Sequence, residues 1–263
     1  EHPTAATLIS VTRDMLEDIR SFLVDHDIIS VPSAVRALVA ETPKHLRWAF
    51  AMMDTPGPYE TEATEAYYYV TPVDPDWSEE QAEEWLAALN TFALEDISIH
   101  EAYPGHYVHF LHYADAPTDV SRRAASYAFT EGWAHYCEEM MWEEGYRDGD
   151  ARFRLAQLSE ALVRNCRFVC AIRMHAHGMS VDQATQMFID KAAYEETPAR
   201  KEAERGTFDP GYFSYTLGKL QIMRLRDDAR RAWGDAYTLK RFHDTLLSRG
   251  APPVELMREA MGL

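Results

Sequence analysis

The stretch HEAYPGHYVHFLHY, residues 100–113, decides how this chain folds, because a proline and a glycine interrupt what would otherwise be one helix. On an unbroken helix His106 would lie about 120° around the axis from His100, since each residue turns the backbone by about 100°. Pro104 cannot donate a hydrogen bond to the carbonyl of His100, and Gly105 adopts backbone conformations that other residues resist. The sequence therefore predicts a kink that returns His106 to the face of His100. Alanines at both interrupting positions should favour a straight helix.

Most of the remaining sequence has helical periodicity. Between residues 30 and 76 the pattern differs, because β-branched and aromatic residues alternate with prolines there and favour extended segments. The predicted fold class is mainly α, with a small extended or β segment near residues 30–75, in a single domain over residues 1–263. Ser78 with Gln81, and Ser180 with Gln183, form sequence patterns typical of capping boxes at helix starts. The predicted helices span residues 7–24, 79–90, 91–103, 105–114, 121–144, 150–177, 181–192, 198–205, 211–233, 238–249 and 253–261.

Composition narrows the classes of partner. The chain has 263 residues, 46% of them hydrophobic, and a formal net charge of −17, which repels nucleic acid and anionic membrane surfaces. No apolar run reaches the roughly 20 residues of a membrane span. The first residues show neither an initiator Met nor a signal peptide, so we expect that an upstream segment has been removed. Three sparse cysteines favour a reducing compartment, and we expect a cytoplasmic protein.

A second segment, FTEGWAHYCEE at residues 129–139, suggests a metal site. Glu131 lies there in an apolar and aromatic context, where a carboxylate is costly to bury unless it is paired or binds a metal. Two histidines and a downstream glutamate form the His₂Glu ligand set of catalytic zinc sites, and the 25 residues from His106 to Glu131 suffice for a turn and a returning helix. We therefore predict that His100, His106 and Glu131 bind zinc. The familiar zinc-peptidase spacing H-E-x-x-H is lengthened here by the break.

Several neighbouring side chains have two interpretations. His109 and His112 either belong to a polar helix face or support the metal ligands from behind. Asp96, one turn before His100, either orients its imidazole or faces solvent. Cys166 and Cys170, one turn apart, are interpreted as buried thiols rather than as a metal pair.

The motifs HEAYPGH, FTEGWAHY and PGYFSYTLGK, followed by FHDTLLSRG, resemble the DUF885 family, bacterial proteins related to gluzincin metallopeptidases. The resemblance covers residues 8 to 260, and it implies a gluzincin-like helical fold with His100, His106 and Glu131 as zinc ligands and Glu101 as the base. Many members have other residues at His109, His135 and the Tyr212-Phe213 pair, which implies a different pocket lining. Members are about twice as long, so this chain resembles their C-terminal half, and the other half should supply the opposite wall of the cleft.

These residues predict hydrolysis of a peptide or related amide bond by an activated water molecule. Glu101 would take the proton of the water and deliver it to the leaving amine. A further donor would stabilise the oxyanion, and the candidates are Tyr215, which the resemblance favours, Tyr212 and His175.

Two other classes of protein compete with this hydrolase. A di-metal helical bundle would need repeated Glu-x-x-His pairs, but Pro104 and Ala134 occupy the positions three after the two glutamates. A non-catalytic zinc-binding or peptide-binding subunit would depend on a missing N-terminal half or a partner chain. The predicted partners are therefore a peptide or small amide substrate, together with such an N-terminal-half chain or a second copy in a homo-oligomer. An assay with and without the upstream half would separate these classes.

Overall fold

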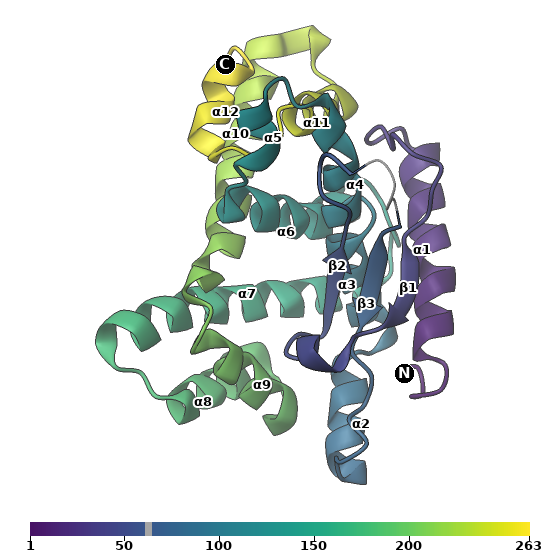
Figure 1. Ribbon diagram of the computed structural model, residues 1–263, viewed down its shortest axis with the longest axis vertical. Helices are drawn as coiled ribbons and strands as arrows, with labels where there is room; N and C mark the ends of the chain where they lie inside the picture. Colours follow the sequence, from purple (N-terminus) through teal and green to yellow (C-terminus); the bar gives the residue numbers. More distant parts are fainter. Residues whose placement is uncertain (61–64) are drawn as a thin grey trace.

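The computed structural model describes residues 1–60 and 65–263 and shows a mainly helical molecule with one small sheet, as predicted (Figure 1). Helices α3, α6, α7 and α10 pack against one another, and α1 lies beside the sheet. None of the helices described has the length and apolar character needed to cross a lipid bilayer. The α-helices are α1 (Leu8–Asp25), α2 (Glu79–Ala88), α3 (Thr91–Glu101), α4 (His106–Leu111), α5 (Asp119–Arg123), α6 (Tyr127–Glu143), α7 (Ala151–His177), α8 (Val181–Ala192), α9 (Glu196–Gly206), α10 (Ser214–Trp233), α11 (Leu239–Leu247) and α12 (Val254–Ala260).

The sheet has three short strands in the order β1-β3-β2, so that β2 is an edge strand. Strand β1 (Leu38–Glu41) runs parallel to β3 (Tyr67–Val70), and β2 (Ala51–Asp54) runs antiparallel to β3. The extended character expected near residues 30–75 is confirmed for these strands, whereas residues 61–64 lie outside the described residues. The sequence pattern did not single out β2, whose four residues AMMD carry no β-branched side chain.

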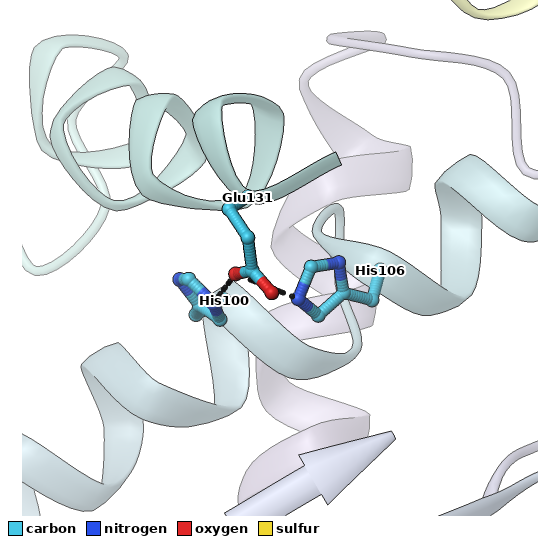
Figure 2. A group of neighbouring side chains, drawn as sticks. All are labelled: His100, His106 and Glu131. Atoms are coloured by element: carbon cyan, nitrogen blue, oxygen red, sulfur yellow. Dashed lines mark ion pairs between the residues drawn. The ribbon is translucent and has the colours of Figure 1, made fainter. Parts of the chain in front are cut away.

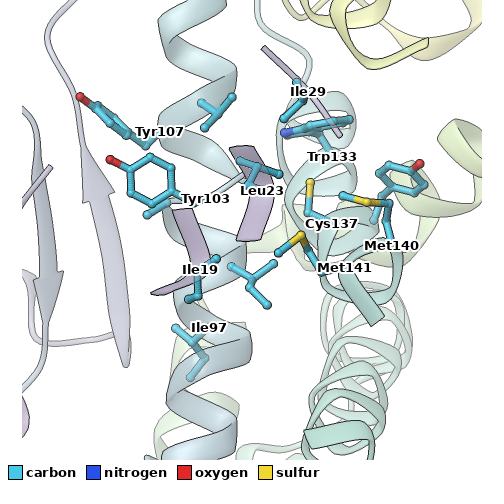
Figure 3. Close-up of a cluster of buried hydrophobic side chains, with 14 of the residues drawn as sticks. Ile19, Leu23, Ile29, Ile97, Tyr103, Tyr107, Trp133, Cys137, Met140 and Met141 are labelled. Atoms are coloured by element: carbon cyan, nitrogen blue, oxygen red, sulfur yellow. The ribbon is translucent and has the colours of Figure 1, made fainter. Parts of the chain in front are cut away.

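The main hydrophobic core joins α1, α3 and α6 (Figure 3). Ile19 and Leu23 of α1 are fully buried there, as are Trp133 and Met140 of α6. Burying one such side chain stabilises the fold by about 1.5–3 kcal/mol. The core thereby fixes α3 and α6, the two helices that carry His100 and Glu131, relative to each other.

Helix boundaries follow local capping. Both predicted capping boxes are present at the starts of α2 and α8, and Gly178 ends α7 with a left-handed φ of 68°. The single helix predicted over residues 121–144 is wrong, because the chain forms α5 and α6 with a break between them. Ser126 explains the break, since its side chain accepts a hydrogen bond from the backbone N–H of Phe129 and starts α6 anew.

Two glycines allow α6 and α10 to cross closely. A Cβ added to Gly132 of α6 would lie 2.4 Å from the carbonyl carbon of Gly218 on α10, and a Cβ on Gly218 would lie 1.7 Å from the carbonyl oxygen of Ala128. No larger residue fits either position without moving a backbone. This contact places the start of α10, with Tyr215, next to the segment of α6 that carries Glu131.

Candidate metal centre

The predicted break is confirmed. Helix α3 ends at Glu101 and α4 begins at His106. The residue four after His100 is Pro104, which has no N–H, and the N–H of Gly105 donates instead to the carbonyl of Ile99 at 3.0 Å. A Cβ on Gly105 would lie 1.7 Å from the carbonyl oxygen of His100, so glycine is required for this close approach. The break brings the rings of His100 and His106 to a centroid distance of 4.9 Å.

Glu131 of α6 lies between the two imidazoles (Figure 2). Its Oε2 atom is 3.3 Å from Nε2 of His100 and 3.4 Å from Nε2 of His106. All three residues are at least nine-tenths buried, and one ligand atom from each side chain lies within 4.8 Å of the other two. The structure thus brings together the three residues that were predicted from the sequence to be metal ligands.

This arrangement fits a divalent cation. Two ligands at about 2.0–2.1 Å from a tetrahedral zinc ion are about 3.3–3.4 Å apart, which matches both distances from Glu131 to the histidines. The Oε2 atom of Glu131 is buried and lacks hydrogen-bond geometry to either ring, although it is close enough for ion pairs. Two imidazoles and one carboxylate are also the donor types that zinc prefers. The group therefore qualifies as a candidate metal centre.

In the metal-free site, opposite charges hold His100, His106 and Glu131 together. Burial opposes a charged imidazole, yet the carboxylates of Glu131 and Glu138 raise the pKa of His100 to about 9. Burial also opposes the charged form of Glu131 and by itself would raise its pKa, but His106 and His100 hold that pKa well below its usual range. The metal-free chain therefore keeps a proton on His100, which a metal ion must displace.

Glu138, two turns beyond Glu131 on α6, supports the site from behind. It is fully buried, and its carboxylate accepts hydrogen bonds from Nδ1 of His100 at 2.7 Å and from Nδ1 of His135 at 2.8 Å. Arg164 of α7 donates a third at 3.1 Å. Burial alone would raise the pKa of Glu138, but Arg164 and His135 hold it well below its usual range. A carboxylate on Nδ1 leaves Nε2 of His100 free for a metal.

Asp96 does not have either of its predicted roles. It is fully buried rather than solvent-facing, and neither carboxylate oxygen has a hydrogen-bond partner among the described residues. Burial and the neighbouring charge of Glu138 raise its pKa well above the usual value, which keeps the side chain protonated. Glu138 orients His100 in its place.

Three further histidines lie away from the three converging atoms. His109 and His112 are buried rather than on a polar face; Nε2 of His112 contacts the carbonyl of Ser30 at 2.9 Å. His175 is exposed, and its Nε2 contacts the carbonyl of Gly206 at 2.9 Å. The structure therefore does not bring His175 to the candidate centre.

A cavity of about 280 Å³ opens onto the candidate centre. Glu101 and Tyr215, two of the proposed catalytic residues, line it together with the three ligand candidates. Edge strand β2 contributes the other wall. The lining residues are Trp48, Ala49, Ala51, Met52, Met53, His100, Glu101, His106, Phe110, Tyr127, Thr130, Glu131, Arg205 and Tyr215.

Of the two tyrosine candidates, Tyr215 lies at the centre and Tyr212 does not. The ring of Tyr215 stacks on that of His100 at 6.0 Å, and its hydroxyl accepts a hydrogen bond from Arg205 at 2.8 Å. Burial raises the pKa of Tyr215, so its hydroxyl keeps the proton that it could donate. The hydroxyl of Tyr212 is buried elsewhere and donates to Glu202 at 2.8 Å.

Sequence reasoning missed two members of this environment, Glu138 and Arg205. A signal for Glu138 exists, because seven residues after Glu131 return to nearly the same helix face, and an acidic residue on that apolar face needs a partner. Arg205 gives no such signal. It lies one residue before the end of a polar helix, α9, and its contacts with Tyr215 and Trp48 at the cavity join segments that are distant in the sequence.

Known proteins resemble this chain as follows. The family model described as "Bacterial protein of unknown function (DUF885)" matches residues 1–261. No curated protein matches the chain. A candidate lipoprotein of unknown function from Shewanella oneidensis is 30% identical with a TM-score of 0.86, over 100% of this chain and 47% of its own. A candidate lipoprotein from Colwellia psychrerythraea is 24% identical with a TM-score of 0.81, over 98% of this chain and 42% of its own. The chain thus spans less than half the length of either structure.

Proposed function

This chain belongs to the DUF885 family of bacterial proteins, and we propose that it hydrolyses peptide or related amide bonds with the help of a bound zinc ion. One observation carries the proposal: His100, His106 and Glu131 converge in a cavity that Glu101 also lines. A His₂Glu set leaves one coordination position open, as catalytic zinc sites do. The proposed relationship to gluzincin metallopeptidases rests on the same ligand types.

The proposed chemistry divides between the ion and the chain. When bound, zinc would supply a Lewis acid that polarises the scissile carbonyl and makes water more acidic. Glu101 directly follows the ligand His100 and is nine-tenths buried in the cavity wall. We assign to it the general base that takes a proton from water and returns it to the leaving nitrogen.

Tyr215 is the proposed donor to the oxyanion of the tetrahedral intermediate. Arg205 donates to the Tyr215 oxygen, which leaves the hydroxyl proton free for another acceptor. Among the residues that the structure describes, the hydroxyl of Tyr127 lies 3.4 Å from that of Tyr215, which is a long contact. A neutral donor placed before the reaction begins stabilises the developing charge without reorganisation.

Strand β2 favours an extended peptide as the substrate. It is the edge of the sheet, so alternate backbone N–H and C=O groups face away from β3. Ala51, Met52 and Met53 of this strand line the cavity. An extended segment could pair with the edge and present its amide bond to Glu101, which is a common mode of peptide recognition.

A second candidate function follows from the length of the relatives. Because the chain spans 47% and 42% of the two structures, we also consider a metal-binding subunit that is not catalytic without a second half. In this hypothesis the chain corresponds to a C-terminal half, and an N-terminal-half chain or a second copy completes the cleft. The predicted cytoplasmic location stays a prediction, and the description of both relatives as candidate lipoproteins favours an exported location instead.

Metal analysis and peptide cleavage test the proposal together. The purified chain should retain about one equivalent of zinc and cleave members of a mixed peptide library followed by mass spectrometry. Glu101→Gln should retain zinc and lose turnover by a factor of about 10² or more, since an amide cannot accept the proton of water. His106→Ala should lose zinc, and the exposed control His175→Ala should not.

Three outcomes separate the hypotheses. Zinc binding and Glu101-dependent cleavage support the hydrolase. Zinc binding without cleavage of any peptide supports the non-catalytic subunit. Equal zinc content in His106→Ala and His175→Ala overturns the ligand assignment and both functions with it.

A further inference from the structure

Arg205 is a buried cation in the wall of the proposed catalytic cavity. Only 7% of the residue is exposed, and it lies at the end of α9 beside Tyr215. Its guanidinium lies 4.9 Å from the ring centroid of Trp48 and 5.0 Å from that of Tyr212. Such an aromatic setting holds a guanidinium in a fixed plane.

The hydrogen bonds of Arg205 leave part of its fork unused. Its bonds to Tyr215 at 2.8 Å and to Asp209 at 3.3 Å both come from Nη2. Its Nε is buried and has no acceptor among the described residues. The neighbouring Arg167 is different, because Glu202 accepts from its Nε and Nη2 at 2.7 Å each. Unlike Arg167, Arg205 thus pairs with a carboxylate, that of Asp209, through one nitrogen only.

The ring of Trp48 lies beside this cation, and the ring of Phe208 lies against that of Trp48. Trp48 lines the cavity and is 40% exposed, and Phe208 is 60% exposed. Their rings meet edge to face with centroids 6.0 Å apart. Exposed rings next to a buried cation suit a ligand that carries an anionic group beside an apolar side chain.

We infer that Arg205, with Trp48 and Phe208, forms a subsite for the free C-terminal carboxylate and apolar last side chain of a peptide. The inference rests on the proposed function, since it names the substrate class of the same cavity. A carboxylate is the planar anion that matches an arginine fork in a bidentate pair. Tyr215 joins this subsite to His100, so cleavage is expected near the C-terminus of the substrate and not within a long chain.

Binding to a chain that cannot turn over tests this inference apart from catalysis. We would titrate zinc-loaded Glu101→Gln by calorimetry with an N-acetylated tetrapeptide ending in Phe, as the free acid and as the C-terminal amide. The free acid should bind at least about 10-fold more tightly, because the amide loses charge-assisted hydrogen bonds. The same tetrapeptide with a free amino terminus should bind as the acetylated one does.

Variants added to Glu101→Gln assign the preference to Arg205. Arg205→Gln should abolish the difference between acid and amide, and Arg205→Lys, which keeps the charge, should reduce it. Arg200→Gln is the matched control, because Arg200 lies on the same helix with an exposed side chain. Thermal melting of each variant would show that it is folded.

Equal affinity for acid and amide, no binding of either peptide, or a preference that survives in Arg205→Lys and Arg205→Gln would each overturn the inference. If Arg205→Gln made in the parent chain, which keeps Glu101, loses cleavage while Arg205→Gln added to Glu101→Gln keeps the preference for the free acid, Arg205 only positions Tyr215, which also overturns the inference. Zinc content and cleavage by the parent judge the proposed function separately.

Discussion

Glu138 contacts His100, His135 and Arg164 with a single buried carboxylate. Glu138→Gln keeps the size of the side chain but removes the charge that accepts all three bonds. We expect about 10–100-fold weaker zinc binding, as for other residues that orient a metal-binding histidine. Competition with a chromogenic chelator would measure it. Glu139→Gln, one residue along and with 27% of its side chain exposed, is the control that should retain parental affinity.

Buried histidines should make the metal-free chain sensitive to acid. Burial lowers the pKa of His109 to about 3 and those of His135 and His243 to about 4, from an ordinary 6.5. Acid therefore protonates these rings in the unfolded chain first, and stability is lost as the pH falls from about 6.5 toward 4. His100 has the opposite sign: its pKa of about 9 contributes stability below pH 6.5 that is lost as the pH rises through 9.

Urea unfolding of the metal-free chain between pH 4.5 and 9 would measure both effects. His109 packs against Phe110 and Phe129, so His109→Phe suits the site and removes one titration. In this variant the slope of the unfolding free energy against pH, on the acid side, should be smaller by about 1.4 kcal/mol per pH unit. The loss of stability toward pH 9, which we attribute to His100, should not change. An unaltered slope on the acid side would contradict the role given to His109.

At the scale of elements, helix propensity and the structure predict opposite effects of a substitution at the break between α3 and α4. Helix propensity alone predicts that alanine at position 105 favours the helix. The structure predicts the opposite, because the new Cβ would lie 1.7 Å from the carbonyl oxygen of His100. Gly105→Ala should lower the free energy of unfolding by about 2 kcal/mol or more and weaken zinc binding, since the backbone must shift at a ligand. Gly57→Ala, where the nearest atom is 3.7 Å away, is the matched control.

The crossing of α6 and α10 gives a second test at this scale. Gly218→Ala places a methyl group 1.7 Å from the carbonyl oxygen of Ala128, so the two helices must separate. We expect a loss of about 2–4 kcal/mol in unfolding free energy and a shift of Tyr215 away from Glu131. Leu220→Ala on the same helix, 54% exposed, should change stability little. Denaturant unfolding and zinc affinity, measured for both variants, would test this prediction.

Much of the fold was predictable from local chemistry. Capping residues such as Ser78 and Ser180 and the interrupting Pro104 act within one turn, so the sequence shows their effect directly. The ligand trio was predictable because its members carry unusual side chains in apolar stretches. Arg205 and the short strand β2 were not, since both depend on which distant segments pack together.

At the scale of the whole molecule, β2 lines the cavity and is also an edge of the sheet. The chain spans less than half of either structural relative, and the family membership covers nearly all of it. All the candidate ligands, the proposed base and the Arg205 subsite lie within this chain. If the proposed second half exists, its contribution is therefore expected to be a wall of the cleft rather than the metal ligands.

The unpaired edge of β2 also offers a surface through which two copies of the molecule could associate. Four residues, of which only Asp54 is charged, offer backbone groups to any extended chain, and a second copy of β2 is one such chain. Two molecules paired through this edge would occupy the backbone groups that we propose for an extended substrate, so a high protein concentration would lower activity. Sedimentation at rising concentration should reveal pairs that an extended peptide dissolves, and Met53→Lys, a charge that natural sheet edges use against pairing, should keep the molecules apart.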